Sequence, residues 1–346
     1  MRSNTFKILC TLCATAVAII LAIGVGSVSI GPGAELAILW HKLSGAALPD
    51  GMDASTVSIL WSIRMPRALC AFLVGGILSV CGVVCQSLLQ NPLASSYTLG
   101  VSSGAALGAA IVILTGVSIP VLSTFLLPLG GFAGALVTVT AVMILSSRID
   151  RGLQNQTIIL FGMVVSLFTS AVLTVLTALA SEHEHQLIRW QMGSFAGKRW
   201  LHVEILAVTA LVSLVFLTGF HRELDILSFG DEQAMSLGVD AIRIKRLLII
   251  VSALLTGIAV CFTGTIGFVD LIAPHAVRRV FGPAHRLTIP LSFCVGGGLL
   301  CLSDLMARTV LAPQDLPVGA VTALFGAPFF LLLYYRGRTG GAGGGL

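Results

Sequence analysis

Three arginines are the residues of this sequence best suited to bind an acidic partner. Arg64 and Arg67 lie on either side of Pro66, and Arg308 lies near the end of a long apolar segment. A guanidinium group pairs with a carboxylate through two parallel hydrogen bonds, so these arginines could receive acidic side chains of an external protein. Their charge also allows a simpler interpretation, in which they lie at a membrane surface and extend toward water.

Ionisable residues in apolar surroundings are further candidates for chemistry. Asp304 precedes Arg308 by four residues, so the two can form a structural ion pair on one helix face. Asp270 has only apolar neighbours and should face a polar cavity or an interface. An ion-coupled secondary transporter using Asp270 or Asp304 is therefore an alternative function. A membrane-embedded hydrolase using His275 is a second alternative, but no nucleophile or metal ligand lies at a suitable spacing.

A long uncharged segment contains polar residues that are candidates for a transport path. Residues 68–147 include no Asp, Glu, Lys, Arg or His. Unpaired amides are costly at membrane depth, so polar side chains here should bond to interrupted backbone or line a water-filled path. Proline disfavours the helical state of the preceding residue, which predicts a helix break at Asn91 and Pro92. The candidates for the path or the break are Gln86, Asn91, Pro92, Ser102 and Ser103.

The longest loop expected on the cytoplasmic side runs from His221 to Lys245. Within it, the segment from Phe229 to Gly238 favours one or two short amphipathic helices. Gly238 is a suitable end for them because glycine is common directly after a helix. Such a loop can bind a soluble partner or can simply connect two membrane helices.

The elements that must position these residues are membrane-spanning helices. The chain is 56% hydrophobic and 10% charged, whereas about 25% of the residues of a soluble domain are charged. One crossing takes about 20 apolar residues. Charge gaps and helix breakers predict ten crossings, at residues 8–30, 67–88, 99–115, 122–145, 155–180, 202–219, 246–263, 266–281, 288–307 and 317–335. We expect an all-α polytopic bundle that forms one transmembrane domain over residues 1–338, followed by a flexible glycine-rich tail at 339–346.

The distribution of charged loops predicts the orientation. Ten crossings place both termini on one side of the membrane. If that side is the cytoplasm, thirteen lysines and arginines face inward and seven face outward, in agreement with the positive-inside rule. We therefore expect a multi-pass protein of the bacterial or archaeal cytoplasmic (inner) membrane. The net charge of +5 follows from these loops and does not indicate nucleic-acid binding.

No nucleotide or metal site is expected on this chain. The nearest match to a phosphate-binding loop has Met192 where the first glycine belongs and Arg199 where serine or threonine belongs. If ATP drives the protein, another chain must hydrolyse it. The eight cysteines all lie in apolar runs, as small buried hydrophobic residues do. The acidic and histidine residues at 182–185 could bind a metal weakly, but a solvated outer loop is the favoured interpretation.

Five stretches, in order, resemble the FecCD-type permease family: the membrane subunits of binding-protein-dependent ABC importers for siderophore-iron, haem and cobalamin. The resemblance extends over residues 60–335. The stretches are Arg64-Met-Pro-Arg67 with Gly75, Gly82 and Gln86; Asn91-Pro-Leu-Ala94 with residues 99–105; Trp190-Gln-Met-Gly-Ser194; Gly230 to Gly238; and Gly267-Phe-Val with Pro274, His275, Arg278, His285, Arg286, Pro290, Asp304, Arg308, residues 316–319 and residues 326–328.

The resemblance implies an assembly of the type II ABC importer kind. Two permeases of ten helices each would surround a central path, as a homodimer or a similar heterodimer, with the homodimer expected here. Two cytoplasmic ABC ATPase subunits would carry ATP and magnesium, and a periplasmic or extracellular binding protein would deliver the substrate. The chain itself would bind no cofactor and would be a transporter subunit, not an enzyme.

The resemblance also assigns residues to these partners. Arg64, Arg67 and Arg308 look like the arginines that receive glutamates of the binding protein. The residues that look like the coupling helices entering a cleft of the ATPase are Gly230, Glu232, Ala234, Leu237 and Gly238.

Three positions depart from the family pattern. Ser96 stands where proline is usual, Asp270 where glycine is common, and Asp315 where glutamate is usual. The first two affect the local geometry of the path. The substrate class expected from the resemblance is a siderophore-iron complex, haem or cobalamin, and an oxyanion would also fit a wide, weakly polar path.

Overall fold

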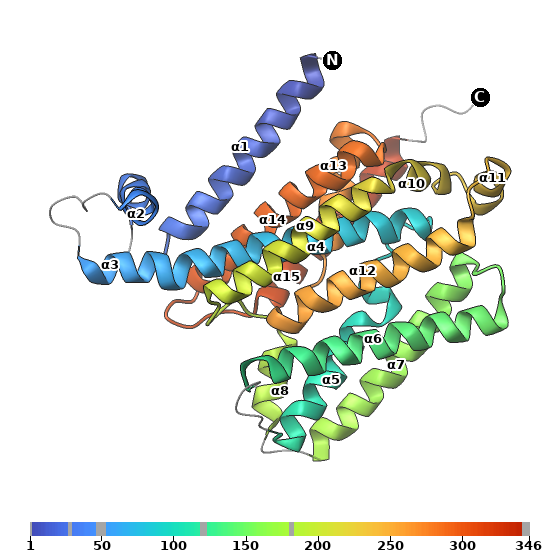
Figure 1. The fold of residues 1–346 in the computed structure, drawn as a ribbon, viewed down its shortest axis with the longest axis horizontal. Helices are drawn as coiled ribbons and strands as arrows, with labels where there is room; N and C mark the ends of the chain where they lie inside the picture. The colour runs from blue at the N-terminus through green and yellow to red at the C-terminus, as the bar shows by residue number, and fades with distance from the viewer. Residues whose placement is uncertain (1, 27–29, 46–52, 118–122, 180–182, 341–346) are drawn as a thin grey trace.

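The fold is a bundle of helices, shown in Figure 1. The computed structural model describes residues 2–26, 30–45, 53–117, 123–179 and 183–340, which form helices and connecting turns without any β-strand. The elements are α1 (Arg2–Gly24), α2 (Pro32–Ser44), α3 (Ala54–Ser58), the π-helix η1 (Ile59–Arg64), α4 (Met65–Leu88), the 3-10 helix η2 (Ser96–Leu99), α5 (Val101–Thr115), α6 (Ser123–Ile149), α7 (Asn155–Leu179), α8 (Glu184–Gln191), α9 (Trp200–Gly219), α10 (His221–Leu227), α11 (Asp231–Ser236), α12 (Ala241–Thr263), α13 (Val269–Phe281), α14 (His285–Thr309) and α15 (Val318–Gly340).

Each of the ten predicted crossings coincides with a helix, which confirms an all-α membrane architecture. Over the described residues, seven helices are long and apolar enough to cross a membrane by themselves. The helices at residues 101–115 and 318–329 are apolar but shorter. The predicted crossing at 266–281 is the 13-residue α13. A helix of that length rises about 20 Å, less than the ~30 Å hydrocarbon layer, so α13 does not cross alone.

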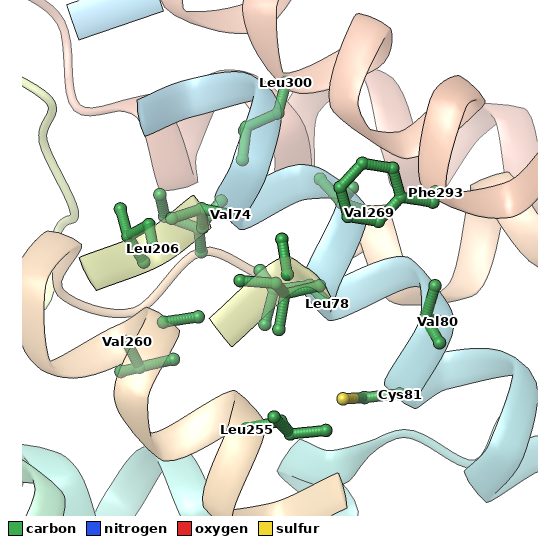
Figure 2. Close-up of a cluster of buried hydrophobic side chains, with 14 of the residues drawn as sticks. Val74, Leu78, Val80, Cys81, Leu206, Leu255, Val260, Val269, Phe293 and Leu300 are labelled. Atoms are coloured by element: carbon green, nitrogen blue, oxygen red, sulfur yellow. The ribbon is translucent and has the colours of Figure 1, made fainter. Parts of the chain in front are cut away.

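Helix α4 lies at the centre of the larger group of helices, packed against α9, α12, α13 and α14. Figure 2 shows Val74 and Leu78 of α4 among apolar side chains of these neighbours. A helix that is apolar on every side can be buried on every side. Gly75 brings α14 close, because a Cβ at this position would overlap the carbonyl oxygen of Gly296.

Helices α5, α6 and α7 form a second group, below α4 and α12 in Figure 1. Their closest contact is between α5 and α6, where Gly104 and Gly108 face Gly134 and Gly130. Small residues let the backbones of membrane helices approach closely. Helix α12 packs against both α4 and α6 and so joins the two groups.

The start of the second crossing differs from the prediction. The sequence predicts a start at residue 67, but the helical segment begins at Ala54 and continues through a π-helical turn into α4. In that turn the Met65 N–H bonds to the Leu60 carbonyl. The wider turn accommodates Pro66, which lacks an N–H and would collide with the preceding turn of a regular α-helix.

Two further regions refine the sequence-based description. The expected outer loop before α4 contains the 13-residue helix α2. At the other end, residues 339 and 340 belong to α15 and not to the flexible tail that the sequence predicts from 339. The rest of that predicted tail, 341–346, lies outside the described residues.

Candidate functional site

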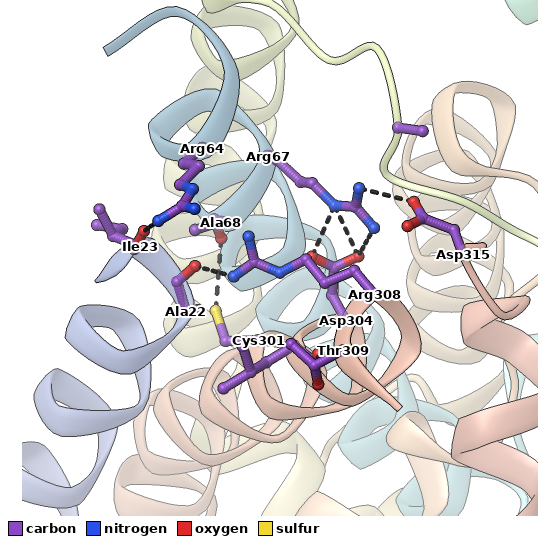
Figure 3. Close-up of polar contacts among 12 residues, drawn as sticks. Ala22, Ile23, Arg64, Arg67, Ala68, Cys301, Asp304, Arg308, Thr309 and Asp315 are labelled. Atoms are coloured by element: carbon purple, nitrogen blue, oxygen red, sulfur yellow. Dashed lines mark hydrogen bonds and ion pairs between the residues drawn. The ribbon is translucent and has the colours of Figure 1, made fainter. Parts of the chain in front are cut away.

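The three candidate arginines lie together at the end of the bundle where α1 ends (Figure 3). Arg67 donates from Nε to Asp304 Oδ2 and from Nη2 to Asp304 Oδ1, each at 2.9 Å, and from Nη1 to Asp315 Oδ2 at 2.8 Å. The Asp304 side chain is 1% exposed and that of Asp315 is 38% exposed. We refer to Arg64, Arg67, Asp304, Arg308 and Asp315 as the arginine cluster. Its central pair ties α4 to α14.

The other two arginines bind the C-terminal end of α1. Arg64 Nη1 donates to the carbonyl oxygens of Gly24 at 2.7 Å and Ile23 at 3.4 Å, and Arg308 Nη2 donates to the carbonyl oxygen of Ala22. The last carbonyls of a helix lack partners within the helix and carry partial negative charge. Two guanidinium groups therefore satisfy and neutralise this end of α1.

These contacts change the expected picture of the arginines. The expected ion pair within α14 is present but long, with Arg308 Nε 3.9 Å from Asp304 Oδ2, and Arg67 is the main partner of Asp304. Arg64 is only 4% exposed. The structure brings the three arginines together as expected, but their side chains bind groups of this chain instead of projecting freely. Docking of a binding protein on them stays a prediction.

A buried carboxyl from α2 lies beside this cluster. Glu35 is 5% exposed. Burial raises the pKa of the Glu35 carboxyl above its usual value, and the nearby positive charge of Arg64 opposes that rise. Glu35 therefore titrates at a higher pH than an exposed glutamate. Glu35 could not be recognised from the sequence, because the segment that forms α2 was expected to be a loop.

The predicted helix break is confirmed at the end of α4. The helix ends at Leu88, and Gln90 adopts a positive φ of 48°. The Asn91 side chain accepts a hydrogen bond from the Leu93 N–H at 2.9 Å, which closes a tight turn ahead of Pro92.

The predicted path residues separate into two places. Gln86, Asn91 and Pro92 line a cavity of about 270 Å³ together with residues of α13 and the start of α14. Ser102 and Ser103 line a different cavity of about 220 Å³. The second cavity carries mainly hydroxyl and amide groups; its other lining residues are Tyr97, Ala106, Ser166, Ser170, Leu173, Gln191 and Thr265. Passage of a substrate along these residues stays a prediction.

Asp270, the second residue of α13, is enclosed within the bundle. It is 2% exposed. A position that faces a polar cavity or lies near a membrane interface stays a prediction. Among the described residues, neither carboxylate oxygen has a hydrogen-bond partner of standard geometry. Its backbone carbonyl accepts a bond from Gln86 Nε2 at 3.2 Å, which fixes the start of α13 against α4.

The residue before α13 has an unusual backbone conformation. Phe268 has a φ of 70°, in the left-handed region that bulky residues rarely adopt. Two contacts hold it there. Gly326 of α15 leaves room for the Phe268 side chain, which a Cβ at that position would overlap. The Tyr97 hydroxyl donates to the carbonyl oxygen of Ile266 at 2.8 Å.

The expected cytoplasmic loop contains the two short helices α10 and α11. The sequence predicts one or two short helices ending at Gly238, and α11 is the helix that lies directly before Gly238. Gly238 has a φ of 84°, and the N–H of Val239 bonds back to the Ala234 carbonyl at 3.0 Å, as in a Schellman cap. Ala234 is buried, whereas Leu237 is 69% exposed. Glu232 is also exposed, and Gly230 begins α11 with a φ of 121°.

This loop is fastened to the bundle by a buried cation. Lys245 of α12 is 1% exposed, and its Nζ donates to Asp231 Oδ2 of α11 at 2.5 Å. The same Nζ lies 3.4 Å from the carbonyl oxygen of Leu153, in the connection between α6 and α7. Helix α11 is therefore held to α12 and to the second group of helices.

A polar network at the C-terminal end of α4 was missed from the sequence. His285 Nε2 lies 2.5 Å from Ser87 Oγ, and His285 Nδ1 lies 2.6 Å from Asp225 Oδ1. Arg278 Nη2 donates to Ser87 Oγ at 3.1 Å. For residues 274–290 the sequence indicated a cytoplasmic docking surface and helix-end contacts. The residues of this network come from α4, α10, α13 and α14, and no short sequence motif joins them.

The described residues contain no group of three or more histidine, cysteine, aspartate or glutamate side chains placed to hold a metal ion.

Comparisons with known proteins agree with this architecture. A sequence profile of the FecCD transport family matches residues 14–336. An uncharacterized ABC transporter permease protein, YvrB of Bacillus subtilis (strain 168), is 39% identical over 326 residues, which are 94% of this chain and 92% of that protein. The cobalamin import system permease BtuC of Halobacterium salinarum is 37% identical over 297 residues, 85% of this chain and 79% of that protein.

Two further matches extend the comparison. The hemin transport system permease HmuU of Yersinia pestis is 36% identical over 294 residues, 83% of this chain and 87% of that protein. A solved structure described as an inward-facing metal-chelate type ABC transporter superimposes with a TM-score of 0.82 at 29% identity, covering 95% of this chain and 99% of that one.

Proposed function

The chain belongs to the FecCD transport family and is a membrane-spanning permease of the ABC importer type; on this premise we propose that it carries an iron–siderophore, haem or cobalamin-type substrate across the inner membrane. The energy comes from ATP hydrolysis in a separate subunit. The chain supplies the path and the moving helices, and it makes no covalent bond to the substrate.

The observation that carries the proposal is the form of the α10–α11 loop. It presents Phe229, Met235 and Leu237, which are 76%, 52% and 69% exposed. Exposed apolar side chains clustered on one loop mark a binding surface for another protein. The polar anchors Asp225 and Asp231 attach the same loop to α14 and α12. A partner bound here therefore contacts elements that are connected to the membrane helices.

The proposed assembly contains two copies of this chain, two cytoplasmic ATPase subunits that hold ATP and magnesium, and an external binding protein. Both termini and the α10–α11 loop face the cytoplasm in this arrangement. The arginine cluster lies at the opposite end of α4 from α10 and α11 (Figures 1 and 3), where an external protein would bind.

The proposed substrate class rests on relatives and on the chemistry of the cavities. The similar permeases are named for cobalamin and hemin, and another, 36% identical over 81% of this chain, is the Fe(3+) dicitrate permease FecD of Escherichia coli. The cavity that includes Ser102 and Ser103 is lined by neutral hydroxyl and amide groups. Neutral groups of this kind suit large chelates that make weak contacts and leave again.

A reconstitution experiment tests the proposal. The chain and its ATPase subunits are placed in liposomes with the external binding protein, and uptake of labelled haemin, cyanocobalamin or a ferric hydroxamate is followed. Uptake should require ATP and the ATPase subunits. Uptake by the chain alone would instead support the alternative of an ion-coupled secondary transporter.

The ATPase surface is tested with one substitution and a matched control. Leu237→Asp should prevent copurification of the ATPase subunits, because a charge replaces an exposed apolar contact. Val310→Asp changes a residue that is 59% exposed at the other end of α14 and should not affect copurification. Equal copurification of the two variants would exclude the α10–α11 loop as the binding surface.

The arginine cluster is tested with charge reversal. The double variant Arg64→Glu with Arg67→Glu should abolish stimulation of ATPase activity by the binding protein while the chain still inserts into the membrane. Asp315→Asn is the control, because it frees Arg67 Nη1 without removing an arginine and should preserve stimulation. Normal stimulation in the double variant would contradict docking at this cluster.

A further inference from the structure

The network at the inner end of α4 connects the loop proposed to bind the ATPase with two membrane helices. We propose that His285 is the positioning residue that transmits displacement of α10 to α4 and α13. This inference rests on the proposed function, because it assumes that an ATPase subunit moves the α10–α11 loop.

His285 is bonded through both nitrogens of its ring. Asp225 of α10 accepts from Nδ1 at 2.6 Å, and the same carboxylate oxygen accepts the backbone N–H of His285 at 2.9 Å. In a neutral ring whose Nδ1 carries the proton, Nε2 is an acceptor. It therefore accepts a hydrogen bond of 2.5 Å from the Ser87 hydroxyl. The ring thus joins α10 to α4 through two short bonds at the first residue of α14.

The connection continues from Ser87 into α13. Arg278 donates to Ser87 Oγ at 3.1 Å, to the Val83 carbonyl at 3.1 Å and to Gln86 Oε1. Gln86 in turn donates to the backbone carbonyl of Asp270 at 3.2 Å. The bonds therefore reach from the inner end of α4 to both ends of α13.

The link from α10 is specific. Within the described part of the chain, Asp225 is the one α10 side chain that bonds to a side chain outside α10. The buried Leu224 and Leu227 add apolar contact. Apolar contact is non-directional, so surfaces can slide against each other. Hydrogen bonds weaken steeply when their angles change. When α10 moves, α4 and α13 must therefore move with it, or the bonds from Asp225 through His285 to Ser87 break.

The order of these groups also occurs in serine hydrolases, but the surroundings of Ser87 favour a structural link. Its hydroxyl donates to His285 and simultaneously accepts from Arg278. A nucleophile must present a free lone pair to its substrate. One of the two lone pairs of the Ser87 hydroxyl is directed to a guanidinium group, which lowers its nucleophilicity. The residue is 7% exposed, although it lines the cavity of about 270 Å³.

Hydrogen–deuterium exchange on the complex tests the inference. The chain and its ATPase subunits are placed in lipid nanodiscs, and backbone exchange is compared without nucleotide and with ATP plus vanadate. In the unmodified complex, exchange should change in α10–α11 and at the inner ends of α4 and α13. In His285→Asn, which keeps only the bond toward Asp225, and in Ser87→Ala, the change at α4 and α13 should be lost while that at α10–α11 persists.

A matched control separates this effect from general loosening. Ser292→Ala removes a buried hydroxyl of α14 that has no hydrogen-bond partner among the described residues. It should respond like the unmodified complex. ATPase binding is measured for each variant, and the two relay variants provide independent tests if one of them folds poorly.

Three results would overturn the inference. The first is a change at α4 and α13 that survives in both relay variants. The second is loss of that change in Ser292→Ala as well. The third is covalent labelling of Ser87 by a fluorophosphonate, which would show a nucleophile in place of a link. If α10–α11 of the unmodified complex shows no change with nucleotide, the proposed function itself fails, and that result is distinct from these three.

Discussion

Arg67 and Asp304, which are 237 residues apart in the sequence, form a bidentate ion pair with two hydrogen bonds of 2.9 Å. The pair fixes the register of α4 against α14 at the end where both helices meet α1. Its carboxylate also lies 3.9 Å from Arg308 Nε. Asp304 is thus the buried negative charge between two arginines.

Asp304→Asn should destabilise the protein strongly, because Arg67 and Arg308 keep their charge and lose the carboxylate between them. Removing one partner of a buried ion pair costs about 3–5 kcal/mol. Asp315→Asn removes the more exposed partner of the same arginine and should cost at most about 1 kcal/mol. Thermal unfolding in detergent measures both, and equal shifts in Tm would contradict the central place of Asp304.

Lys245→Met should release α11 from α12. Asp231 loses its 2.5 Å partner, and a largely buried carboxylate is left near apolar groups. Arg243→Met is the matched control on the same helix, because the Arg243–Asp240 pair is exposed, with side chains 87% and 51% accessible. We expect faster protease cleavage between residues 228 and 240 in Lys245→Met only. Similar cleavage of both variants would contradict the anchoring of α11.

Gly108→Ala should separate α5 from α6. A Cβ at this position would overlap the Gly130 carbonyl, and overpacking of this kind costs about 1–3 kcal/mol. Gly219→Ala, at the end of α9, meets no neighbouring atom and should be neutral or stabilising by up to about 1 kcal/mol. Thermal unfolding of the two variants measures the difference. A lower Tm for Gly219→Ala than for Gly108→Ala would show that the α5–α6 contact is not tight.

Glu35 should make stability fall as the pH rises. Because burial raises its pKa in the folded protein above 4.5, the folded state holds the proton more firmly than the unfolded state. The stabilisation of the folded state by protonated Glu35 is fully present below pH 4.5 and is lost as the pH rises through the raised pKa. Glu35→Gln, which mimics the protonated form, should gain stability over the unmodified protein across that range. A pH-independent difference in Tm would contradict this.

Asp150 provides a control of opposite sign. Backbone N–H groups of Gln154 and Gly152 bond to its carboxylate and lower the pKa of Asp150 below its usual 3.8. Its contribution to stability is therefore present above pH 3.8 and is lost as the pH falls through the lowered pKa. In Asp150→Asn, the stability should fall less as the pH is lowered into the acid range. The dependence of stability on pH that Glu35 causes should stay unchanged.

Charge gaps and helix breakers were enough to predict most of the helices. Segments such as α6 and α12 are long, apolar and bounded by charge, so their lengths follow from membrane thickness. The start of α4 could not be predicted, because a proline at position 66 normally indicates a helix start and the π-helical turn that accommodates it leaves no sequence pattern. Helix α2 was missed because it is short and contains Glu35, His41 and Lys42 among its apolar residues.

The candidate residues were found more readily than their partners. Arg64, Arg67 and Arg308 stand out as charges beside apolar segments, but what they bind depends on which helices pack together. The carbonyl oxygens at the end of α1 carry no sequence signal. His285 is among the residues that carry the family resemblance, but its partners could not be predicted, because Ser87 and Asp225 lie on helices far from it in the chain.

The left-handed conformation of Phe268 has a mechanical consequence. A bulky residue in this region costs of order 1–3 kcal/mol, which the surrounding contacts must supply. Gly326 and Tyr97 hold the joint before α13 in that state. If α15 or η2 moved away, these contacts would be lost and the strain would favour an ordinary backbone geometry at Phe268. The segment before α13 is therefore a place where a rearrangement of helices would relieve strain stored in this one.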